Sequence, residues 1–380
     1  MTPTTHGDEV LSPAPLRGYR VAVVAHDGRQ RQVEAFERLG AEVVVGSVVA
    51  AVPAPAHDAL EGAIDAVVAG PLDAVVVTSP AGVAGWVAAA EEHRRGQALR
   101  RVVAGIPVMA RGRAAAAAAE AQALAVAGEL AGGEAAQVRQ LAVALGGLEG
   151  RRVAVQVEAA AEDGLTASLG HAGAEVVVVA VPVPGLPEDR EPARRLLGDV
   201  AGSRVEALTL TSPAEVANLV ALAEETGSRG RLVAALTGEV VVVASTPACQ
   251  ASARAAGVEG VVVADPPRLG AMVEVVVEHV RRRRQCLILA GVAVRVAGAL
   301  ALVGDTEVWL ADRERALLAA LIRRPGAVVA KSELLQRVWR STEVDAHAVE
   351  VAVGRLRRRL GPAGAALETV PRRGYRLVAD

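Results

Sequence analysis

The segment from Asp345 to Arg376 restricts the fold of this chain more than any other stretch, because it joins a basic amphipathic pattern to two short apolar runs. At 3.6 residues per turn, its first half forms a helix with two different sides. The apolar side consists of Val349, Val353, Leu356 and Leu360. The opposite side consists of His347, Val351, Gly354, Arg355 and Arg358. One side is therefore expected to pack against a core, and the other to meet a partner.

The sequence after this helix predicts a basic hairpin. Gly361 and Pro362 end the helix, since glycine and proline both terminate helices. Leu367–Val370 and Tyr375–Val378 are then expected as two strands, and their turn carries Arg372–Arg373. A helix whose outer side is uncharged in its first half and carries arginine in its second half fits a DNA major groove and touches phosphates.

The helix and the hairpin together resemble the winged-helix DNA-binding domain of OmpR/PhoB-type response regulators. The residues that carry the resemblance are Val349, Val351, Val353, Arg355, Leu356, Arg357, Leu360, Thr369, Val370, Gly374, Tyr375, Arg376 and Leu377. The resemblance implies double-stranded DNA as a partner, with a homodimer or a co-regulator on the DNA left open. The implied DNA contacts are His347, Val351, Arg355, Arg358, Arg372, Arg373 and Tyr375. Arg357 and Arg359 flank the packed side, and a structural role is the alternative for them.

Charge is distributed unevenly along the chain. From Gln285 onward there are 15 Arg and Lys residues against 10 Asp and Glu, whereas residues 1–284 carry 26 against 33. Positive charge concentrated at one end is what a DNA-binding domain requires. A phosphoacceptor receiver, the usual partner of an OmpR-type domain, needs a lysine beside an acidic cluster. Because the chain's single lysine, Lys331, lies in the C-terminal part, control by phosphorelay is not expected.

Residues 286–303 are apolar except for Arg295, which raises the alternative of a membrane-spanning helix. An arginine near the middle of a bilayer costs roughly 2.5–3.5 kcal/mol on insertion scales. Gly291, Gly298 and Gly304 divide the segment into short β-rich runs. An antiparallel sheet ahead of the C-terminal helices is therefore predicted, and no membrane partner is expected.

The first 283 residues alternate between strand-like and helix-like segments. The expected strands are Tyr19–Ala25, Glu42–Val49, Leu72–Val77, Val102–Met109, Gly150–Gln156, Glu175–Pro182, Val205–Leu210, Val240–Ala244 and Val261–Ala264. Most are followed by a helix, and Gly40 and Gly173 close two of these helices. This alternation predicts two α/β units, each with a parallel sheet.

Two of these strands end in the same tripeptide, Thr-Ser-Pro, at residues 78–80 and 211–213. Hydroxyl groups at a strand-to-helix turn, together with the N–H groups of the helix, are suited to holding a carboxylate. Two arginines that follow another strand are suited to balance its charge. The candidate ligand-binding residues are Thr78, Ser79, Arg111, Arg113, Thr211 and Ser212. The alternative for the Thr-Ser pairs is N-capping alone.

The order of these elements resembles the uroporphyrinogen-III synthase (HemD) family over about residues 16–283. The features that carry the resemblance are Leu16–Gly18, Leu39–Val43, the two Thr-Ser-Pro turns, Ala110–Gly112, Val153–Gln156 and Gly173–Val176. It implies a two-lobed α/β fold with the ligand cleft between the lobes, here followed by a winged helix-turn-helix α+β domain. The implied divisions are a loose tail over 1–15, a discontinuous first lobe over 16–53 and 181–283, a second lobe over 54–180, and a DNA-binding domain over 284–380.

The synthase family closes hydroxymethylbilane, which carries eight carboxylates, into uroporphyrinogen III with loss of water. This chain departs from the family pattern in two places. Ala180–Pro184 lacks the tyrosine that many synthases carry there, and Val243–Ala248 lacks a glycine of the family pattern. The first hypothesis is therefore a transcriptional regulator whose synthase-like part senses a small metabolite, such as a tetrapyrrole precursor. The alternative is an active uroporphyrinogen-III synthase that carries a DNA-binding domain, and no catalytic residue is assigned.

No metal or cofactor is expected, because the seven histidines are scattered and the two cysteines have no ligand spacing. Cys249 and Cys286 are predicted to be buried reduced thiols, which indicates the cytoplasm. Arg281–Arg284 ends the last helix of the synthase-like part and runs directly into the C-terminal part. Positive charge suits the C-terminal end of a helix, and a nonspecific phosphate contact is the alternative for this run. Since this linker is short and has no Gly/Ser stretch, the two parts are not expected to tumble independently.

Overall fold

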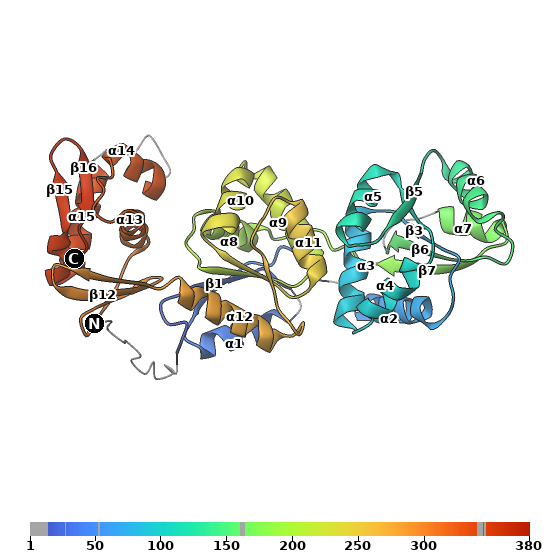
Figure 1. Cartoon of the computed structure of the whole chain (residues 1–380), viewed down its shortest axis with the longest axis horizontal. Helices are drawn as coiled ribbons and strands as arrows, with labels where there is room; N and C mark the ends of the chain where they lie inside the picture. Colours follow the sequence, from blue (N-terminus) through green and yellow to red (C-terminus); the bar gives the residue numbers. More distant parts are fainter. Residues whose placement is uncertain (1–13, 27, 52–53, 160–163, 340–344, 346) are drawn as a thin grey trace, which may run out of the picture.

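The computed structural model describes residues 14–26, 28–51, 54–159, 164–339, 345 and 347–380. Three bodies follow one another in a row (Figure 1). Two are α/β lobes, and the third, at one end of the row, holds the C-terminus. The middle body contains both the first strand of the chain and the residues that lead into the C-terminal body.

Lobe 1, the middle body, is built on a parallel sheet in the order β10-β9-β8-β1-β2. Its strands are β1 (Arg20–Val23), β2 (Glu42–Val45), β8 (Ala207–Leu210), β9 (Val241–Ala244) and β10 (Val262–Val263). Its helices are α1 (Arg29–Arg38), α8 (Glu191–Ala201), α9 (Pro213–Glu225), α10 (Arg229–Gly238), α11 (Pro247–Ala255) and α12 (Leu269–Arg282). Ala22 packs in the core under α8–α11, whereas Val21 and Val23 pack on the α1 and α12 side. Because helices cover both faces of the sheet, its strands are largely apolar on both sides.

Lobe 2 is built on a second parallel sheet, in the order β5-β4-β3-β6-β7. Its strands are β3 (Ala74–Val77), β4 (Val108–Arg111), β5 (Val126–Leu130), β6 (Arg152–Glu158) and β7 (Glu175–Val181). Its helices are α2 (Ala54–Ala69), α3 (Pro80–Glu92), α4 (Gly96–Ala104), α5 (Gly112–Ala121), α6 (Glu134–Leu145) and α7 (Gly164–His171). Val75 and Val77 pack on the side of Trp86, and Val76 packs on the side of α6 and α7. The prediction of two α/β units with parallel sheets is therefore confirmed.

One predicted strand of lobe 2 is wrong in its first half. The strand expected over Val102–Met109 begins only at Val108, and Val102 and Val103 belong to α4. Leu99 and Val103 are both buried and lie one helical turn apart, which is a helical spacing that the short apolar run concealed. Short apolar runs are ambiguous between helix and strand for this reason.

The chain leaves lobe 1 after β2 and returns to it after β7. The two connecting segments lie against each other, since the Ala50 N–H donates to the Gly185 carbonyl at 2.9 Å. The lobes also touch through helices: the Ala248 N–H of α11 donates to Glu91 Oε2 of α3 at 3.2 Å, and Gln122 Nε2 donates to the Ala248 carbonyl at 3.5 Å.

The C-terminal body is a winged-helix domain. It opens with an antiparallel sheet of β11 (Gln285–Leu289), β12 (Val292–Ala297), β13 (Leu300–Val303) and β14 (Thr306–Trp309). The elements that follow are α13 (Asp312–Ile322), α14 (Lys331–Leu334), the π-helical turn η1 (Leu335–Trp339), α15 (His347–Arg359), the 3-10 segment η2 (Gly361–Ala366), β15 (Leu367–Val370) and β16 (Gly374–Leu377). Side chains from the first sheet, α13, α15 and the final hairpin share one core.

The segment that raised the alternative of a membrane helix forms β11–β13, so the predicted antiparallel sheet is confirmed. Among the described residues, no helix is long and apolar enough to cross a membrane. The prediction of two buried thiols holds for Cys249 and is wrong for Cys286, which is exposed. Cys286 lies on β11, where neighbouring residues on its side of the strand face solvent.

Candidate DNA-binding surface and ligand sites

Helix α15 separates its residues into a core side and a solvent side. The buried residues are Val349, Ala352, Val353 and Leu356. The exposed residues include His347, Glu350, Val351, Arg355 and Arg358. Val351 is a large apolar side chain with 39 % of its surface exposed, directly between charged neighbours. An apolar residue and arginines on one open helical face provide what base edges and phosphates require.

The four arginines at the end of this helix fall into two pairs. Arg357 donates from Nε to the Leu367 carbonyl at 2.7 Å and from Nη2 to Thr369 Oγ1 at 2.9 Å. Arg359 lies 3.5 Å from the buried Glu314 carboxylate. These two arginines therefore hold α15 to the hairpin and to α13. Arg355 and Arg358 are exposed and have no ion-pair partner in the part of the chain that the structure describes.

Glu350 places a negative charge on the exposed side of α15, and two neighbours compensate it. Lys331 Nζ lies 2.5 Å from Glu350 Oε1, and His347 Nδ1 lies 3.3 Å from Glu350 Oε2. The hydrogen bond from Lys331 lowers the pKa of Glu350 and, in return, raises the pKa of Lys331. The carboxylate therefore repels an approaching polyanion less than an isolated one would.

The hairpin of β15 and β16 forms the wing. Arg372 and Arg373 are exposed at its tip, and Arg372 adopts a left-handed backbone conformation with φ 59°. Position 374, with φ 139°, requires glycine. The wing here lies against Val329, just before α14, and a Cβ on residue 374 would lie 2.0 Å from the Val329 carbonyl oxygen. Tyr375 is only 4 % exposed and packs in the domain core. Its side chain supports the wing from inside, so we assign it no DNA contact.

A groove of about 710 Å³ runs between the end of α15 and the wing. Arg358 lines it on the helix side, and Glu368 and Thr369 line it on the wing side. Arg358 of the helix and the first residues of the wing thus border one concave strip. Such a strip suits a phosphate backbone that runs between a groove-bound helix and a wing.

In lobe 2, the structure brings the predicted ligand residues together. Val77 pairs with Ala110 across β3 and β4, so Thr78 and Arg111 follow side by side at the carboxyl edge of the sheet. Ser79 Oγ accepts a hydrogen bond from the Gly82 N–H at 3.1 Å and is the N-cap of α3. The Thr78 N–H donates to Gln156 Oε1 at 3.1 Å. Arg113 is exposed in the first turn of α5.

In lobe 1, the equivalent pair is already occupied by a carboxylate of the protein. The Thr211 N–H and hydroxyl donate to the two oxygens of Glu215 at 2.6 and 2.5 Å. Ser212 Oγ accepts from the Glu215 N–H at 3.3 Å and caps α9. Since Glu215 is 2 % exposed, a ligand carboxylate would have to displace it from Thr211.

The two Thr-Ser pairs do not meet. Ser79 caps the first turn of α3, whereas Glu91 in its last turn bonds to the first turn of α11 in lobe 1. Helix α3 has 13 residues, so its two ends are about 20 Å apart at 1.5 Å per residue. Glu215 acts electrostatically on Glu92 at the far end. The two predicted half-sites therefore lie at opposite ends of one helix.

The junction between the lobes is acidic. Glu92 lies at the end of α3 with part of its side chain exposed. Its pKa is raised to about 7 by burial and by repulsion from Glu215 and Glu91. Glu91 is compensated by Arg100, whose Nη2 lies 2.5 Å from its carboxylate.

No metal centre or reactive thiol accompanies these residues. Among the described residues, no group of three His, Cys, Asp or Glu side chains is placed to hold a metal ion. The Cys249 thiol is fully buried and hydrogen-bonds to Thr246, and burial raises its pKa to about 12. A thiol with that pKa is not a nucleophile at neutral pH.

The structure reveals a contact between lobe 1 and the winged-helix domain that sequence patterns did not indicate. Arg315 of α13 forms an ion pair with Glu206, and their side chains are only 10 % and 19 % exposed. Arg315 Nη2 also donates to the Ser203 carbonyl at 2.9 Å, and the Arg20 N–H donates to Glu206 Oε2 at 2.7 Å. The Ala299 N–H donates to the Gly18 carbonyl at 2.7 Å across the same boundary.

Two more ion pairs surround this contact. Arg20 Nη1 lies 2.7 Å from Asp312, and Arg17 Nη1 lies 2.6 Å from Glu307. Backbone packing is also close, since a Cβ on Gly18 would lie 2.5 Å from the Ala297 carbonyl oxygen. The winged-helix domain is therefore docked on lobe 1 by specific contacts, in addition to the short connection between α12 and β11.

Comparison with known proteins divides the chain in the same two parts. Residues 30–274 match the family model described as uroporphyrinogen-III synthase HemD. Residues 305–377 match the model described as transcriptional regulatory protein, C terminal.

Individual relatives match one part or the other. The transcriptional regulatory protein TcrA of Mycobacterium tuberculosis is 43 % identical over 79 residues, 20 % of this chain and 31 % of that protein. A putative uroporphyrinogen-III synthase of Methanothermobacter thermautotrophicus is 36 % identical over 100 residues, 26 % of this chain and 38 % of that protein. The chain thus spans only about a third of the length of these curated relatives. A solved uroporphyrinogen III synthase of Thermus thermophilus is similar with 22 % identity and a TM-score of 0.39, covering 70 % of this chain and 98 % of that one.

Proposed function

The chain belongs to the uroporphyrinogen-III synthase HemD family, and from this and its C-terminal domain we propose that it is a DNA-binding transcriptional regulator whose synthase-like lobes bind a small effector. The expected effector is a carboxylate-bearing metabolite such as a tetrapyrrole precursor. No cofactor is part of this proposal. Because the proposed partner is DNA, the proposed location is the cytoplasm.

The observation that carries the proposal is the division of arginines on α15. Arg357 and Arg359 are used within the domain, whereas Arg355 and Arg358 remain on the exposed side beside Val351. A surface that only served solubility would not need its arginines sorted in this way. Arg355 and Val351, with His347, are the proposed base-contacting residues, and Arg358 and the wing arginines are the proposed phosphate contacts.

The docked interface supplies a physical route from effector to DNA. Lobe 1 touches the winged-helix domain through Glu206, Arg20 and Arg17. A ligand that shifts these lobe 1 residues on binding would change the surface on which the winged-helix domain rests. The ligand shifts DNA binding only as far as it binds the two arrangements with different affinity.

The experiment that tests DNA recognition is selection of binding sites from a random duplex library with the purified full chain. The selected site is then titrated against the parent and against the Arg355→Ala/Arg358→Ala variant at physiological salt. We expect the double variant to lose about 2–5 kcal/mol of binding free energy, on the order of 1–3 for each base-contacting arginine and less for a phosphate contact. Arg190→Ala/Arg229→Ala, on lobe 1, is the matched control. Equal affinity of parent and double variant would remove α15 as the DNA-binding helix.

The family match over residues 30–274 favours a second candidate function, an active uroporphyrinogen-III synthase. One feature counts against it: the end of β7 runs into Ala180–Pro184 without the tyrosine of the family pattern. Turnover of enzymatically generated hydroxymethylbilane, with the isomers separated by chromatography, decides between the two. Type III isomer above the spontaneous type I background would establish the enzymatic function.

A further inference from the structure

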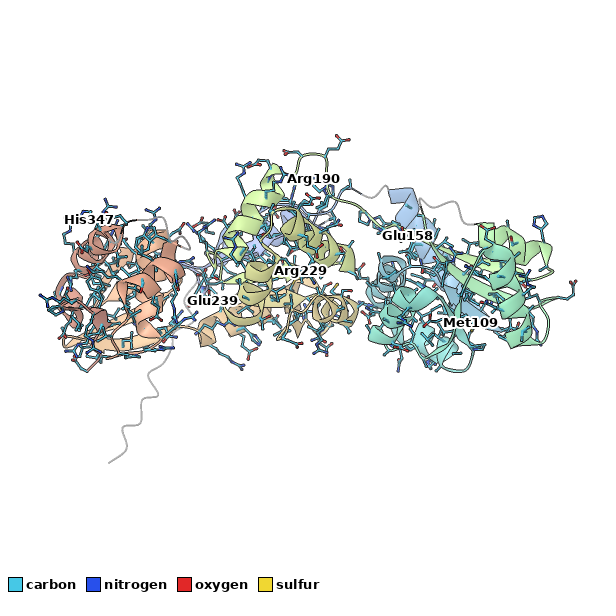
Figure 2. All side chains as sticks on the ribbon, turned by 90° about the horizontal axis from the view of Figure 1, so that it is seen from above. Met109, Glu158, Arg190, Arg229, Glu239 and His347 are labelled. Carbon is cyan, nitrogen blue, oxygen red and sulfur yellow. The ribbon has the colours of Figure 1, made fainter. Side chains whose placement is uncertain are left out.

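A large cleft separates lobe 1 from the winged-helix domain on the side of α10 and α13. It has a volume of about 1640 Å³, which is larger than the roughly 300–1,000 Å³ of a typical small-molecule pocket. Residues 201–206 and α10 form one wall, and α13 and η1 form the other. Figure 2 shows Glu239, one of its lining residues, at the boundary between the two bodies, and His347 of α15 on the outer side of the winged-helix domain.

The lining of this cleft is strongly basic. Its arginines are Arg204, Arg231, Arg283, Arg313, Arg315, Arg323 and Arg337, and its carboxylates are Glu206, Glu239 and Asp312. Each of the three carboxylates already has an arginine: Glu206 pairs with Arg315, Glu239 with Arg323, and Asp312 with Arg20. Arg204 and Arg337 pair with acids on their own side of the cleft, Asp199 and Glu333.

Three arginines are left without a carboxylate within ion-pair distance in the described part of the chain, and they come from both walls. Arg231 and Arg283 belong to lobe 1, and Arg313 belongs to α13. Arg283 Nη1 donates to the Glu239 carbonyl at 2.5 Å; burial lowers the pKa of Arg283, and the Glu239 carboxylate, already paired with Arg323, partly offsets this.

The indole of Trp339 provides one more N–H donor beside these arginines. Arg313 lies over the ring of Trp339, 5.9 Å from its centroid, in a cation–π contact that fixes the guanidinium beside the cleft. The Trp339 Nε1–H is buried and has no acceptor among the described residues. The cleft thus offers several N–H donors, from these arginines and from Trp339. A small anion between the two walls would be attracted by the arginines of both.

We propose that this interdomain cleft binds a small polyanion, one with at least two phosphate or carboxylate groups, held jointly by Arg231 and Arg283 of lobe 1 and Arg313 of the winged-helix domain. The ligand is a small molecule and not the DNA backbone, because no residue of α15 or of the wing lines the cleft. An anion bound to both walls stabilises the docked arrangement. Binding itself is independent of the proposed function, and only its effect on DNA affinity rests on that function.

The test uses the full chain, with pyrophosphate and citrate as separate probes and sodium chloride adjusted to constant ionic strength. Isothermal titration is carried out on the parent, on Arg231→Gln/Arg313→Gln, and on Arg229→Gln/Arg324→Gln. The last variant removes two arginines from α10 and from the residues just after α13 that do not line the cleft. We expect the Kd of at least one probe to rise tenfold or more in the first variant and to change less than twofold in the control.

Binding of pyrophosphate alone identifies a phosphate site, and binding of citrate alone identifies a polycarboxylate site. Equal loss in both variants, or no binding of either probe to the parent, overturns the proposal. A second measurement excludes the DNA backbone: without a probe, the Arg231→Gln/Arg313→Gln variant must keep the parent's salt dependence of DNA binding. A slope reduced by about two would mean that these arginines contact DNA phosphates, and the proposal would be wrong. If no DNA binding is seen at all but the probes still bind, the proposed function fails and this site stands.

Discussion

Replacing Arg315 by methionine removes the charge that compensates Glu206 and keeps most of the buried volume. Glu206 is buried between lobe 1 and α13, and burial raises its pKa even though Arg315, the Arg20 N–H and Arg20 itself lower it. Without Arg315 the carboxylate remains buried and unpaired, a change that typically costs 3–5 kcal/mol. This cost should destabilise the contact between lobe 1 and the winged-helix domain, because Glu206 and Arg315 belong to different bodies.

Amide hydrogen exchange at Ala299 measures this cost directly. Its N–H donates to the Gly18 carbonyl across the interface and exchanges only when the two bodies separate. A loss of 3–5 kcal/mol corresponds to exchange faster by roughly a hundredfold to a few thousandfold. Because a carboxyl with a raised folded pKa favours the interface when protonated, the effect should shrink as the pH falls below the pKa of Glu206 and grow as the pH rises through it.

Two further variants make the test specific. Arg323→Met removes the exposed pair with Glu239 at the same boundary, and an exposed pair of this kind is worth about 0–1 kcal/mol, so exchange should rise by no more than about fivefold. Arg315→Met combined with Glu206→Leu replaces the buried pair by apolar side chains, and most of the protection should return. If Ala299 exchanged within about fivefold of the parent rate in folded Arg315→Met, the buried pair would not hold the interface.

Three other predictions follow from the described geometry. Arg372→Ala/Arg373→Ala at the wing tip should weaken binding to selected and scrambled DNA alike and lower the salt dependence of the binding constant by about two. Arg355→Ala should instead reduce the discrimination between the two DNAs. An unchanged salt dependence in the wing variant would exclude phosphate contacts there. Because the pKa of Glu92 is raised to about 7 from 4.5, the free energy of unfolding should fall as the pH rises from about 4.5 through 7. Glu92→Gln should make the melting temperature less dependent on pH over that range. Parallel plots of melting temperature against pH for parent and variant would contradict this. The purified chain should form no type III isomer from hydroxymethylbilane above the spontaneous background, and excess type III isomer would favour the enzymatic function.

The alternation of strands and helices could be predicted because its patterns are local, whereas the discontinuous two-lobed arrangement came from the family resemblance, and β5 (Val126–Leu130) was not predicted. The apolar strands of lobes 1 and 2 end at polar turns and are followed by helices, and this alternation is readable without tertiary information. The two sides of α15 were predicted for the same reason, since helical periodicity fixes which of its residues share a face. The predicted burial of Val349, Val353 and Leu356 is confirmed.

The environment of the candidate ligand-binding residues could not be predicted from the sequence. Thr78 and Thr211 have the same local sequence, and both following serines cap a helix. Their different environments depend on Glu215, which bonds to Thr211, whereas the corresponding position after Thr78 is Gly82. The placement of the two pairs at opposite ends of α3, which is about 20 Å long, follows from how the lobes pack, and no local pattern contains that information.

Coupling between the two parts was predicted from the short linker that ends at Arg284. The structure adds a docked surface in which Glu206 and Arg315 are 109 positions apart in the sequence. Glu206 directly precedes the strand that ends in the second Thr-Ser-Pro turn, but that pattern gives no indication of its partner. The same holds for the basic cleft, whose arginines are assembled from α10, the end of α12 and α13.

The most direct test of the proposed function is the ratio of affinities of the purified chain for a selected duplex and for a scrambled duplex of equal length, measured by fluorescence anisotropy at physiological salt. Specific regulators typically bind their sites at least about 10³-fold more tightly than other DNA. We predict a ratio of that size, which Arg355→Ala should reduce by roughly tenfold or more. Equal affinities for the two duplexes would contradict the proposal that this chain is a sequence-specific transcriptional regulator.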